Sequence, residues 1–331
     1  MNEIATQNRF KVLTINNIAP AGLERLSADT FDVGPQVQSA DALLLRSADL
    51  HSMEIALSVL AIGRAGAGVN NIPIDEMSKR GVAVFNAPGA NANAVKELVI
   101  AGLLLAARNI CPAWDFARGV KGDDESIHQL VEAGKKRFVG FELPGRTLGV
   151  IGLGAIGVLV ANAARGLGMN VVGFDPGMTV SRAWQLSADV VEASSVDEVL
   201  RRADMVSVHV PFGPKTTGLI DHASIASMRD NVTLLNFARG GIVDEQAVVA
   251  ALAAGKMHAY VCDFPSEALF GLERVIALPH IGASTHEAEE NCAVMVANQV
   301  RAFLEDGTVR NSLGDVLQFL YRGLRAFIVI K

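Results

Sequence analysis

The sequence contains few cysteines, few aromatic residues and no excess of positive charge. Its three cysteines, Cys111, Cys262 and Cys292, are widely spaced and form no CxxC pair. This pattern argues against a disulfide framework and a cysteine-based zinc site, so we expect no bound metal and a reducing, cytoplasmic location. A net charge of −6 provides no basic face, and we therefore expect no nucleic-acid partner.

Membrane signals are also scarce. Residues 1–10 are polar and of mixed charge, without the apolar core of a signal peptide. Residues 147–164 form an uncharged stretch of about 18 residues, which is near the length of a membrane span. The stretch contains four glycines and an asparagine, and its first part is typical of a short strand followed by a turn. We therefore expect no membrane partner.

The composition that remains favours an α/β protein of roughly two domains. Half of the 331 residues are hydrophobic, only 5% are aromatic and 31 are glycine, which suits buried parallel strands covered by Ala-rich helices. Short apolar runs alternate with longer helical patterns, which predicts right-handed βαβ units. Strands are expected at residues 10–15, 42–45, 82–85, 148–151, 171–174, 205–209, 233–236, 259–262 and 275–278. Helices are expected at residues 94–107, 156–167, 245–254 and 287–304.

Two further local features concern helix starts and an unusual segment. Residues 284–287, Ser-Thr-His-Glu, form a capping box, and Asp244 stands where an N-cap belongs. Residues 111–146 mix Trp114 and several glycines with polar and basic clusters. Because this segment lies between a long helix and the next strand, we interpret it as a crossing between domains, with a plain surface loop as the alternative.

A glycine-rich turn predicts a dinucleotide site. Gly152, Gly154 and Gly157 form a GxGxxG between an expected strand and an Ala-rich helix. The first glycine permits the tight turn, the second lets the backbone approach a pyrophosphate, and the third allows close helix–strand packing. Asp175 follows the next strand, where its carboxylate accepts from both ribose hydroxyls and repels a 2′-phosphate. The pattern therefore favours NAD over NADP.

Three later residues suit the oxidation of a hydroxyacid. Arg239 follows an expected buried strand, and its guanidinium is shaped to hold a carboxylate and polarise the neighbouring carbonyl. His280 also follows an expected strand, and Glu267 lies about 13 positions before it. The Glu267 carboxylate is suited to orient the His280 ring and stabilise its protonated form, so the pair suits proton transfer to or from a substrate oxygen. An arginine that bridges two loops and a neutral core histidine are the alternatives.

Seven motifs together resemble those of the D-isomer-specific 2-hydroxyacid dehydrogenase family over roughly residues 10–310. They are GRAGAGVNNI (63–72), NAPGANANAVKELVIAGLLLAARN (86–109), GRTLGVIGLGAIG (145–157), SVHVPFGPKTTGLI (207–220), NFARGGIVDE (236–245), DFPSE (263–267) and LPHIGAST (278–285). Asp263 and Glu267 are one residue closer than in the family's common DVFxxEP form, and Ala268 replaces the proline. The loop from Glu267 to His280 is also short, so both departures concern loop geometry.

The resemblance implies two Rossmann-like domains with parallel sheets and ligands between them. An NAD-binding domain at 93–282 is inserted into a discontinuous substrate-binding domain at 1–92 and 283–310. Residues 311–331 are expected to form a C-terminal tail without a complete regulatory domain. The family also implies a homodimer, with a small-molecule substrate as its other partner.

The resemblance further implies NAD-dependent oxidation of 3-phospho-D-glycerate to 3-phosphooxypyruvate, the first step of L-serine biosynthesis. A glyoxylate or hydroxypyruvate reductase, or another D-2-hydroxyacid dehydrogenase, is the nearer alternative, and a non-enzymatic NAD-sensing corepressor-like protein is the distant one. Arg46 and Arg64 distinguish oxidation of 3-phospho-D-glycerate from the nearer alternative, because an unphosphorylated substrate does not need their positive charge.

The resemblance also assigns residues to each role. The catalytic residues expected from it are Arg239, Glu267 and His280. The residues expected around the cofactor are Ala67, Gly152, Gly154, Ala155, Ile156, Gly157, Asp175, His209, Val210, Pro211, Phe237, Ala238, Arg239, Asp263, His280, Ile281, Gly282 and Ala283. Those expected around the substrate are Arg46, Ser47, Arg64, Ala67, Gly68, Lys135 and Arg239, with Lys135 reaching the phosphate from a second subunit.

Overall fold

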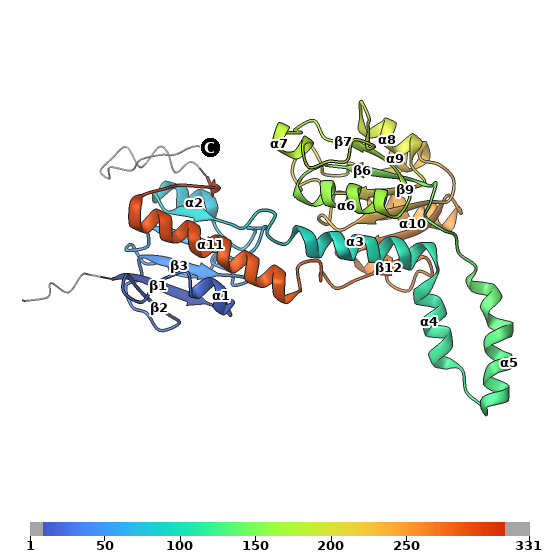
Figure 1. Cartoon of the computed structure of the whole chain (residues 1–331), viewed down its shortest axis with the longest axis horizontal. Helices are drawn as coiled ribbons and strands as arrows, with labels where there is room; N and C mark the ends of the chain where they lie inside the picture. The colour runs from blue at the N-terminus through green and yellow to red at the C-terminus, as the bar shows by residue number, and fades with distance from the viewer. Residues whose placement is uncertain (1–8, 315–331) are drawn as a thin grey trace, which may run out of the picture. The chain divides into compact units, whose positions relative to one another are not determined.

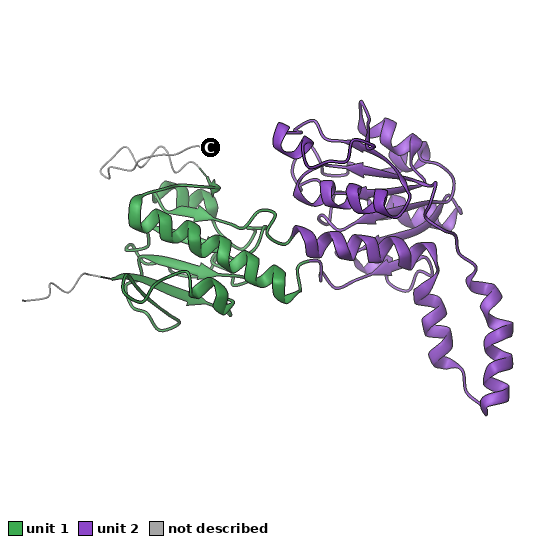
Figure 2. Cartoon of the chain, viewed as in Figure 1, with its two compact units in different colours: residues 1–91, 283–331 green, residues 92–282 purple. Residues whose placement is uncertain are grey.

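The computed structural model describes residues 9–314. Two compact units make up the chain (Figure 2). Unit 1 takes in the chain as far as Asn91 and again from Ala283, and unit 2 runs from Ala92 to Gly282. Each unit has a predominantly parallel sheet, so the predicted α/β class with two Rossmann-like sheets is confirmed. The predicted tail at 311–331 lies, beyond residue 314, outside the described residues.

Unit 2 contains a seven-stranded parallel sheet in the order β12-β11-β10-β9-β6-β7-β8 (Figure 1). From β6 the chain builds outward in one direction through β7 and β8, and in the other through β9 to β12. Ligands of such sheets bind where the order reverses, which here is beside β6 and β9. The strands are β6 (Thr147–Ile151), β7 (Asn170–Phe174), β8 (Val191–Glu192), β9 (Met205–Val208), β10 (Val232–Asn236), β11 (Met257–Cys262) and β12 (Val275–Ala277).

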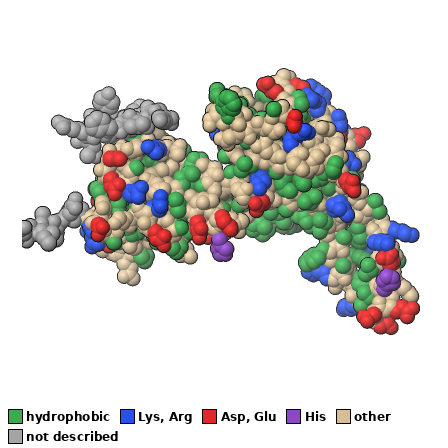
Figure 3. Space-filling model, in the orientation of Figure 1, with side chains coloured by type: hydrophobic (Ala, Val, Ile, Leu, Met, Phe, Trp, Pro, Cys, Tyr) green, Lys and Arg blue, Asp and Glu red, His purple; other side chains and the backbone are tan. Residues whose placement is uncertain are grey.

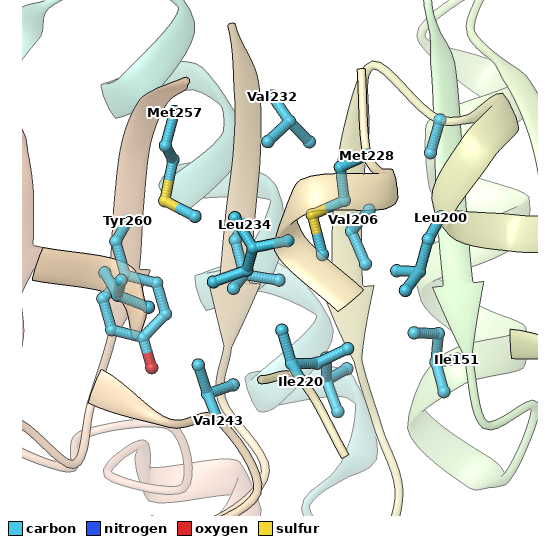
Figure 4. Packing of buried hydrophobic residues seen from close by; sticks show 14 of the residues in the cluster. Ile151, Leu200, Val206, Ile220, Met228, Val232, Leu234, Val243, Met257 and Tyr260 are labelled. Atoms are coloured by element: carbon cyan, nitrogen blue, oxygen red, sulfur yellow. The ribbon is translucent and has the colours of Figure 1, made fainter. Parts of the chain in front are cut away.

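Helices cover both faces of this sheet, and the central strands β9 and β10 are accordingly buried along their whole length. Leu234 belongs to the hydrophobic cluster on one face and Leu235 to that on the other, as the alternation of a strand requires. Figure 4 shows Leu234 and Val206 packed beside Met228 in the first of these clusters. One face carries α3 (Ala92–Ala107) and α6 (Ala155–Gly166), and the other carries α8 (Val196–Arg202), α9 (His222–Ser227) and α10 (Glu245–Ala253).

The described part of unit 1 has a six-stranded sheet in the order β13-β5-β4-β3-β1-β2, in which β13 alone is antiparallel. The helix α11 (His286–Asp306) returns from late in the chain and packs against α1 and β4. A Cβ atom at Gly63 would lie 2.7 Å from Val296, so this glycine lets α11 lie directly on the sheet. The other elements are β1 (Phe10–Ile15), α1 (Pro20–Leu23), β2 (Phe31–Gly34), β3 (Ala42–Leu45), β4 (Ala61–Arg64), α2 (Ile74–Lys79), β5 (Ala83–Phe85) and β13 (Ser312–Leu313).

The segment interpreted as a crossing between domains is a helical arm within unit 2, so that prediction is wrong. The arm consists of α4 (Ile110–Gly119), α5 (Asp124–Gly134) and the 3-10 helix η1 (Lys135–Phe138), and it projects from the body of the unit (Figure 1). Asp123 caps α5 by accepting from the Ser126 N–H, and the rings of Phe116 and Phe138 pack at 5.4 Å between centroids. These contacts favour a hairpin of two short helices over an open loop.

Local predictions otherwise differ from the structure mainly at helix ends and in short strands. Asp244 caps α10, as predicted. The N-cap of α11 is Thr285, whose hydroxyl accepts from the Ala288 N–H, so the predicted capping box is one residue out of register. The strands β2, β4, β8 and β13 were not predicted, because their sequences are short or interrupted by polar residues and glycine.

The described part of the chain has no candidate membrane span and no candidate metal site. None of the helices between residues 9 and 314 combines the length and apolar content that a membrane span requires. In the same stretch, no three His, Cys, Asp or Glu side chains gather in a way that suits a metal ion.

Candidate active site

The residues predicted for unit 2 lie mostly in loops at one edge of its sheet. Because all seven strands are parallel, the loops after their carboxyl ends meet at this edge. The loop after β6 carries the glycine-rich turn, and the loops after β7 and β9 carry Asp175 and His209. The loops after β10, β11 and β12 carry Arg239, Asp263 and His280.

The three glycines of the turn have three different environments. Gly152 has a φ of +91°, and a Cβ atom there would lie 2.6 Å from the His209 carbonyl oxygen. A Cβ atom at Gly157 would lie 1.9 Å from the Gly152 oxygen, so this glycine lets α6 begin tightly against the turn. A Cβ atom at Gly154 would meet nothing within 4 Å. The open space beside Gly154, at the N-terminus of α6, fits the pyrophosphate of a dinucleotide.

Asp175 is held against the same turn. One of its carboxylate oxygens accepts from the Leu153 N–H at 2.9 Å, and the other accepts from the Gly177 N–H at 2.8 Å. These bonds fix the carboxylate beside the glycine turn and leave further lone pairs for hydroxyl donors. The position and charge fit the ribose of a dinucleotide.

His209, after β9, lines this edge as a neutral side chain. Its Nε2 lies 2.8 Å from the Ser207 hydroxyl, and burial lowers the pKa of the ring to about 4. The imidazole is therefore uncharged at neutral pH. Val210 and Pro211 follow it and are half-buried and exposed, respectively.

Arg239 is positioned by Asn236, the buried last residue of β10. The Asn236 side chain donates to the Arg239 carbonyl at 2.9 Å and accepts from the Ala238 N–H at 3.1 Å. The Arg239 guanidinium donates to the Ala238 carbonyl at 2.7 Å and remains half-buried. Phe237, two residues before Arg239, is buried in the hydrophobic cluster on the face covered by α3 and α6.

The ring of Phe264 brings Arg239 and His280 together. The His280 ring lies 4.2 Å from the Phe264 ring between centroids, and the Arg239 guanidinium carbon lies 5.7 Å from the same centroid. His280 is exposed and has a φ of +48°. Glu267 is also exposed, at the start of the 3-10 helix η2 (Glu267–Leu269).

Asp263 is a buried carboxylate next to this group. It is only 3% exposed, and among the described residues its Oδ1 has no hydrogen-bond partner. Burial raises the pKa of this carboxyl to about 6, although the charge of Arg239 opposes the rise. Gly282 is buried beside Asp263, because a Cβ atom there would lie 3.5 Å from its Oδ2. An unsatisfied buried oxygen marks a place for an N–H donor, and the carboxamide of NAD provides one.

The two arginines predicted for the substrate lie at neighbouring strand ends of unit 1. Arg64 ends β4, and Arg46 directly follows β3, which pairs with β4 in parallel. The Arg46 Nη1 forms an ion pair with the Glu289 Oε1 of α11 at 2.7 Å. The Arg64 guanidinium lies against Gly66, where a Cβ atom would lie 1.8 Å from its Nη1.

The other predicted residues of unit 1 surround these arginines in sequence. Ser47 is exposed, and Gly68 is half-buried. The Ala67 carbonyl accepts from the buried Asn86 side chain at 2.7 Å, which fixes the loop after β4.

Three more predicted residues remain to be placed. One lies on the arm, and two lie in sequence at or next to the boundary between the two units. Lys135 lies on the arm, exposed and paired with Glu132. Ile281 is 40% exposed, and Ala283 is the first residue of the returning part of unit 1.

Sequence reasoning missed three residues that position others. Asn236 and Asn86 hold the loops of Arg239 and Ala67, and a polar residue at the end of an aliphatic strand is the signal that marks both. Glu289 pairs with Arg46 from a distant part of the sequence, and no local pattern marks it.

Comparisons with known proteins agree with these observations. Residues 102–282 match the family model described as "D-isomer specific 2-hydroxyacid dehydrogenase, NAD binding domain". This match confirms the resemblance that the motifs indicated.

Two relatives are named D-3-phosphoglycerate dehydrogenase. The protein from Methanocaldococcus jannaschii is 38% identical over 285 residues, covering 83% of this chain and 52% of the relative. The protein from Mycobacterium tuberculosis is 41% identical over 313 residues, covering 88% of this chain and 56% of the relative. The chain therefore spans about half the length of the curated relatives that it matches.

A solved structure is similar over nearly the whole chain. The holo form of D-mandelate dehydrogenase from Rhodotorula graminis superposes with a TM-score of 0.78 at 25% identity. The superposition covers 92% of this chain and 98% of that one.

Proposed function

The chain belongs to the D-isomer-specific 2-hydroxyacid dehydrogenase family, and from this premise we propose that it oxidises 3-phospho-D-glycerate to 3-phosphooxypyruvate with NAD. This reaction is the first step of L-serine biosynthesis. The observation that carries the choice of substrate is the pair of arginines, Arg46 and Arg64, at neighbouring strand ends of unit 1. The relatives named D-3-phosphoglycerate dehydrogenase support the same choice.

The two units divide the work in this proposal. Residues 93–282 bind the cofactor and carry the reacting groups, and residues 1–92 with 283–310 bind the substrate. The glycine turn and Asp175 hold the dinucleotide, and the orphaned Asp263 oxygen accepts from its carboxamide. Bound NAD supplies the acceptor to which the hydrogen on substrate C2 transfers with its electron pair.

The protein groups handle the carboxylate and the proton. The Arg239 guanidinium donates to the substrate carboxylate and to the oxygen on C2, which polarises the C–O bond. The His280 ring takes the proton of the C2 hydroxyl, so a carbonyl forms as the C2 hydrogen leaves. The Glu267 carboxylate stabilises the protonated ring, since a nearby negative charge favours the imidazolium.

The two arginines of unit 1 bind the phosphate end. Arginine forms bidentate bonds to phosphate oxygens, and two guanidinium groups match a dianion. Ser47 and the loop from Ala67 to Gly68 provide further polar groups around the substrate. Lys135 adds a positive charge from a second subunit.

A substrate panel tests this proposal. NAD reduction is measured with 3-phosphoglycerate, D-glycerate, D-lactate and 2-hydroxyglutarate, and 3-phosphoglycerate is expected to give the highest kcat/KM. The Arg46→Ala variant is expected to raise the KM for 3-phosphoglycerate about 10- to 100-fold, because it removes a charge-assisted hydrogen bond. An equal rise in KM for D-glycerate would remove the phosphate assignment and favour a glyoxylate or hydroxypyruvate reductase.

The same panel covers the non-enzymatic alternative. If the wild-type protein binds NADH but turns over no member of the panel, the corepressor-like reading replaces the enzyme. Turnover of any member excludes that reading.

We also propose a homodimer in the cytoplasm. Figure 3 shows hydrophobic side chains gathered on unit 2 over α3 and along the arm. The large hydrophobic residues of α3, the arm and the position after it that are exposed are Leu104, Ile110, Trp114, Leu130, Val131 and Val139. A second copy of the chain would bury this surface, as apolar interfaces of homodimers do, and sedimentation velocity measures the state directly. Three free cysteines are consistent with a reducing compartment.

A further inference from the structure

Arg46 already has a counter-ion. The Glu289 carboxylate lies 2.7 Å from its guanidinium, and the two side chains are 38% and 35% exposed. Both groups are therefore within reach of a ligand from solvent. To bind a phosphate, the Arg46 guanidinium must either release the Glu289 carboxylate or bond to both anions at once.

The backbones on both sides of this pair are fixed. Glu289 lies in the first turn of α11, which Thr285 caps. Cβ atoms at Gly22 and Gly63 would lie 2.6 Å from Ala293 and 2.7 Å from Val296, so α11 packs closely against α1 and β4 at these glycines. Exchange of the counter-ion therefore requires only rotation of the two side chains.

The loop that carries Arg46 is held as well. The Asn71 side chain donates to the Arg46 carbonyl at 3.3 Å, and the Ala48 N–H donates to the Asn16 side chain at 2.7 Å. Only the long side chain of Arg46 is left to adapt to a ligand.

Arg64 belongs to the same charge cluster. Its guanidinium lies over Gly66, and its charge acts on the thiol of Cys292, one turn after Glu289 on α11. Burial raises the pKa of that thiol, whereas the charges of both Arg64 and Arg46 oppose the rise. The cluster thus combines two guanidinium groups with one carboxylate, and its formal charge is smaller than that of the arginines alone.

We propose that Glu289 is an exchangeable counter-ion that positions Arg46 between turnovers and gives it up to the phosphate end of the substrate. This inference rests on the proposed function, because it assumes that Arg46 binds phosphate. A phosphate with close to two negative charges competes for the guanidinium better than a single carboxylate does. The repulsion between Glu289 and the phosphate keeps binding weak enough for product to leave.

The Glu289→Gln variant separates charge from geometry. The amide oxygen still accepts from Arg46, whereas the negative charge is gone. The KM for 3-phosphoglycerate is expected to fall about three- to tenfold, since a partly exposed charge near another interacts at a high effective dielectric constant. The kcat is not expected to rise, and the KM for D-glycerate is expected to change less than twofold.

Three controls accompany this variant. Glu290→Gln removes the same charge one position along α11 from an exposed side chain, and it is expected to leave both KM values unchanged. In the Arg46→Ala background, Glu289→Gln is expected to lose its effect, because the double-mutant cycle isolates the pair. Calorimetric titration with inorganic phosphate is expected to give a lower Kd for Glu289→Gln than for the wild-type protein.

The outcomes separate this inference from the proposed function. An unchanged or higher KM for 3-phosphoglycerate in Glu289→Gln, with an unchanged Kd for inorganic phosphate, would overturn the counter-ion role while the dehydrogenase stands. Equal gains in Glu290→Gln would also overturn it. Absence of 3-phosphoglycerate turnover in the wild-type protein would overturn the function, and the phosphate titration would still decide whether Glu289 weakens anion binding.

Discussion

In unit 2 the side chains at the strand ends are fixed by nearby stretches of the chain, whereas in unit 1 Arg46 is held from the other end of the sequence. The Asn236 side chain bonds to Ala238 and Arg239, and Asp175 bonds to the adjacent glycine turn. Arg46 instead pairs with Glu289 on the returning helix α11. The cofactor edge is therefore built by local motifs, and the arginine edge depends on the fold of the whole unit.

The charged side chains of the two sites also differ in whether they already have a partner. Arg46 and Glu289 form a half-exposed pair, which a charged ligand can exchange. Asp263 is buried, and one of its oxygens has no partner among residues 9–314. Arg46 of unit 1 thus already has a partner of opposite charge, whereas Asp263 of unit 2 has an oxygen that is left for a ligand to bond. In our proposal, changes in unit 2 affect every substrate, and changes at the arginines affect only phosphorylated ones.

The largest effect is expected for His280→Ala. The loss of the proton acceptor is expected to lower kcat about 10²- to 10⁴-fold for every substrate that the wild-type protein oxidises, with NADH binding within a few-fold of wild type. Steady-state NAD reduction and NADH fluorescence titration measure the two quantities. Loss of turnover of 3-phosphoglycerate but not of D-glycerate would contradict the expectation that changes in unit 2 affect every substrate, because His280 would then act in substrate selection. His222→Ala, on the exposed start of α9, is the matched control.

The next effect concerns the local construction of the cofactor turn. Gly154→Ala places a methyl group in open space, so the thermal midpoint of unfolding is expected to stay within about 1 °C while the Kd for NADH rises about tenfold or more. Gly152→Ala combines an unfavourable positive φ with a clash against the His209 carbonyl. It is expected to weaken NADH binding and also to cost about 1–3 kcal/mol of stability.

These two variants test whether the turn is formed before the cofactor binds. Differential scanning fluorimetry without ligand separates them, and fluorescence titration with NADH gives both affinities. Equal thermal midpoints for the two variants would mean that the glycines act only through the ligand.

The contrast between the units explains what the sequence predicts and what it does not. The turn from Gly152 to Gly157, Asp175 and the cap at Asp244 are recognisable because each belongs to a short sequence motif or follows one at a characteristic spacing. The β3 strand is recognisable because Ala42–Leu45 is a continuous apolar run, whereas β4 includes Gly63, where a Cβ atom would meet side chains of β3 and of α11.

The arm, the exact cap of α11 and the ion pair between Arg46 and Glu289 were not predicted, for physical reasons. The arm forms from two short helices whose contacts between Phe116 and Phe138 join residues far apart in the segment. The cap of α11 falls on Thr285 and not on Ser284, because adjacent hydroxyl residues compete for one N-cap position. The ion pair between Arg46 and Glu289 requires the tertiary fold, so only the structure reveals it.

The smallest effect, in the pH dependence of stability, sharpens the contrast in charge. Burial raises the pKa of Asp263 to about 6 from 3.8, so the folded protein binds this proton more tightly than the unfolded chain does. Asp263 therefore makes the protein less stable as the pH rises from about 4 to 6, and the full cost remains above pH 6. His209, with its pKa lowered from 6.5 to about 4, acts in the opposite direction, since it destabilises the fold as the pH falls through the same range.

Asp263→Asn removes the first of these opposing effects and leaves the second. The variant is expected to be more stable than the wild-type protein at pH 8, by on the order of 1–3 kcal/mol, and the difference is expected to shrink by about half at pH 5. Thermal unfolding at the two pH values measures this, with Glu192→Gln on the exposed strand β8 as the control. A difference that is constant with pH would mean that the pKa of Asp263 is not raised in the folded protein. The carboxylate of Asp263 would then be ionised at no cost to the folded state, and the contrast with the ion pair of unit 1 would not hold.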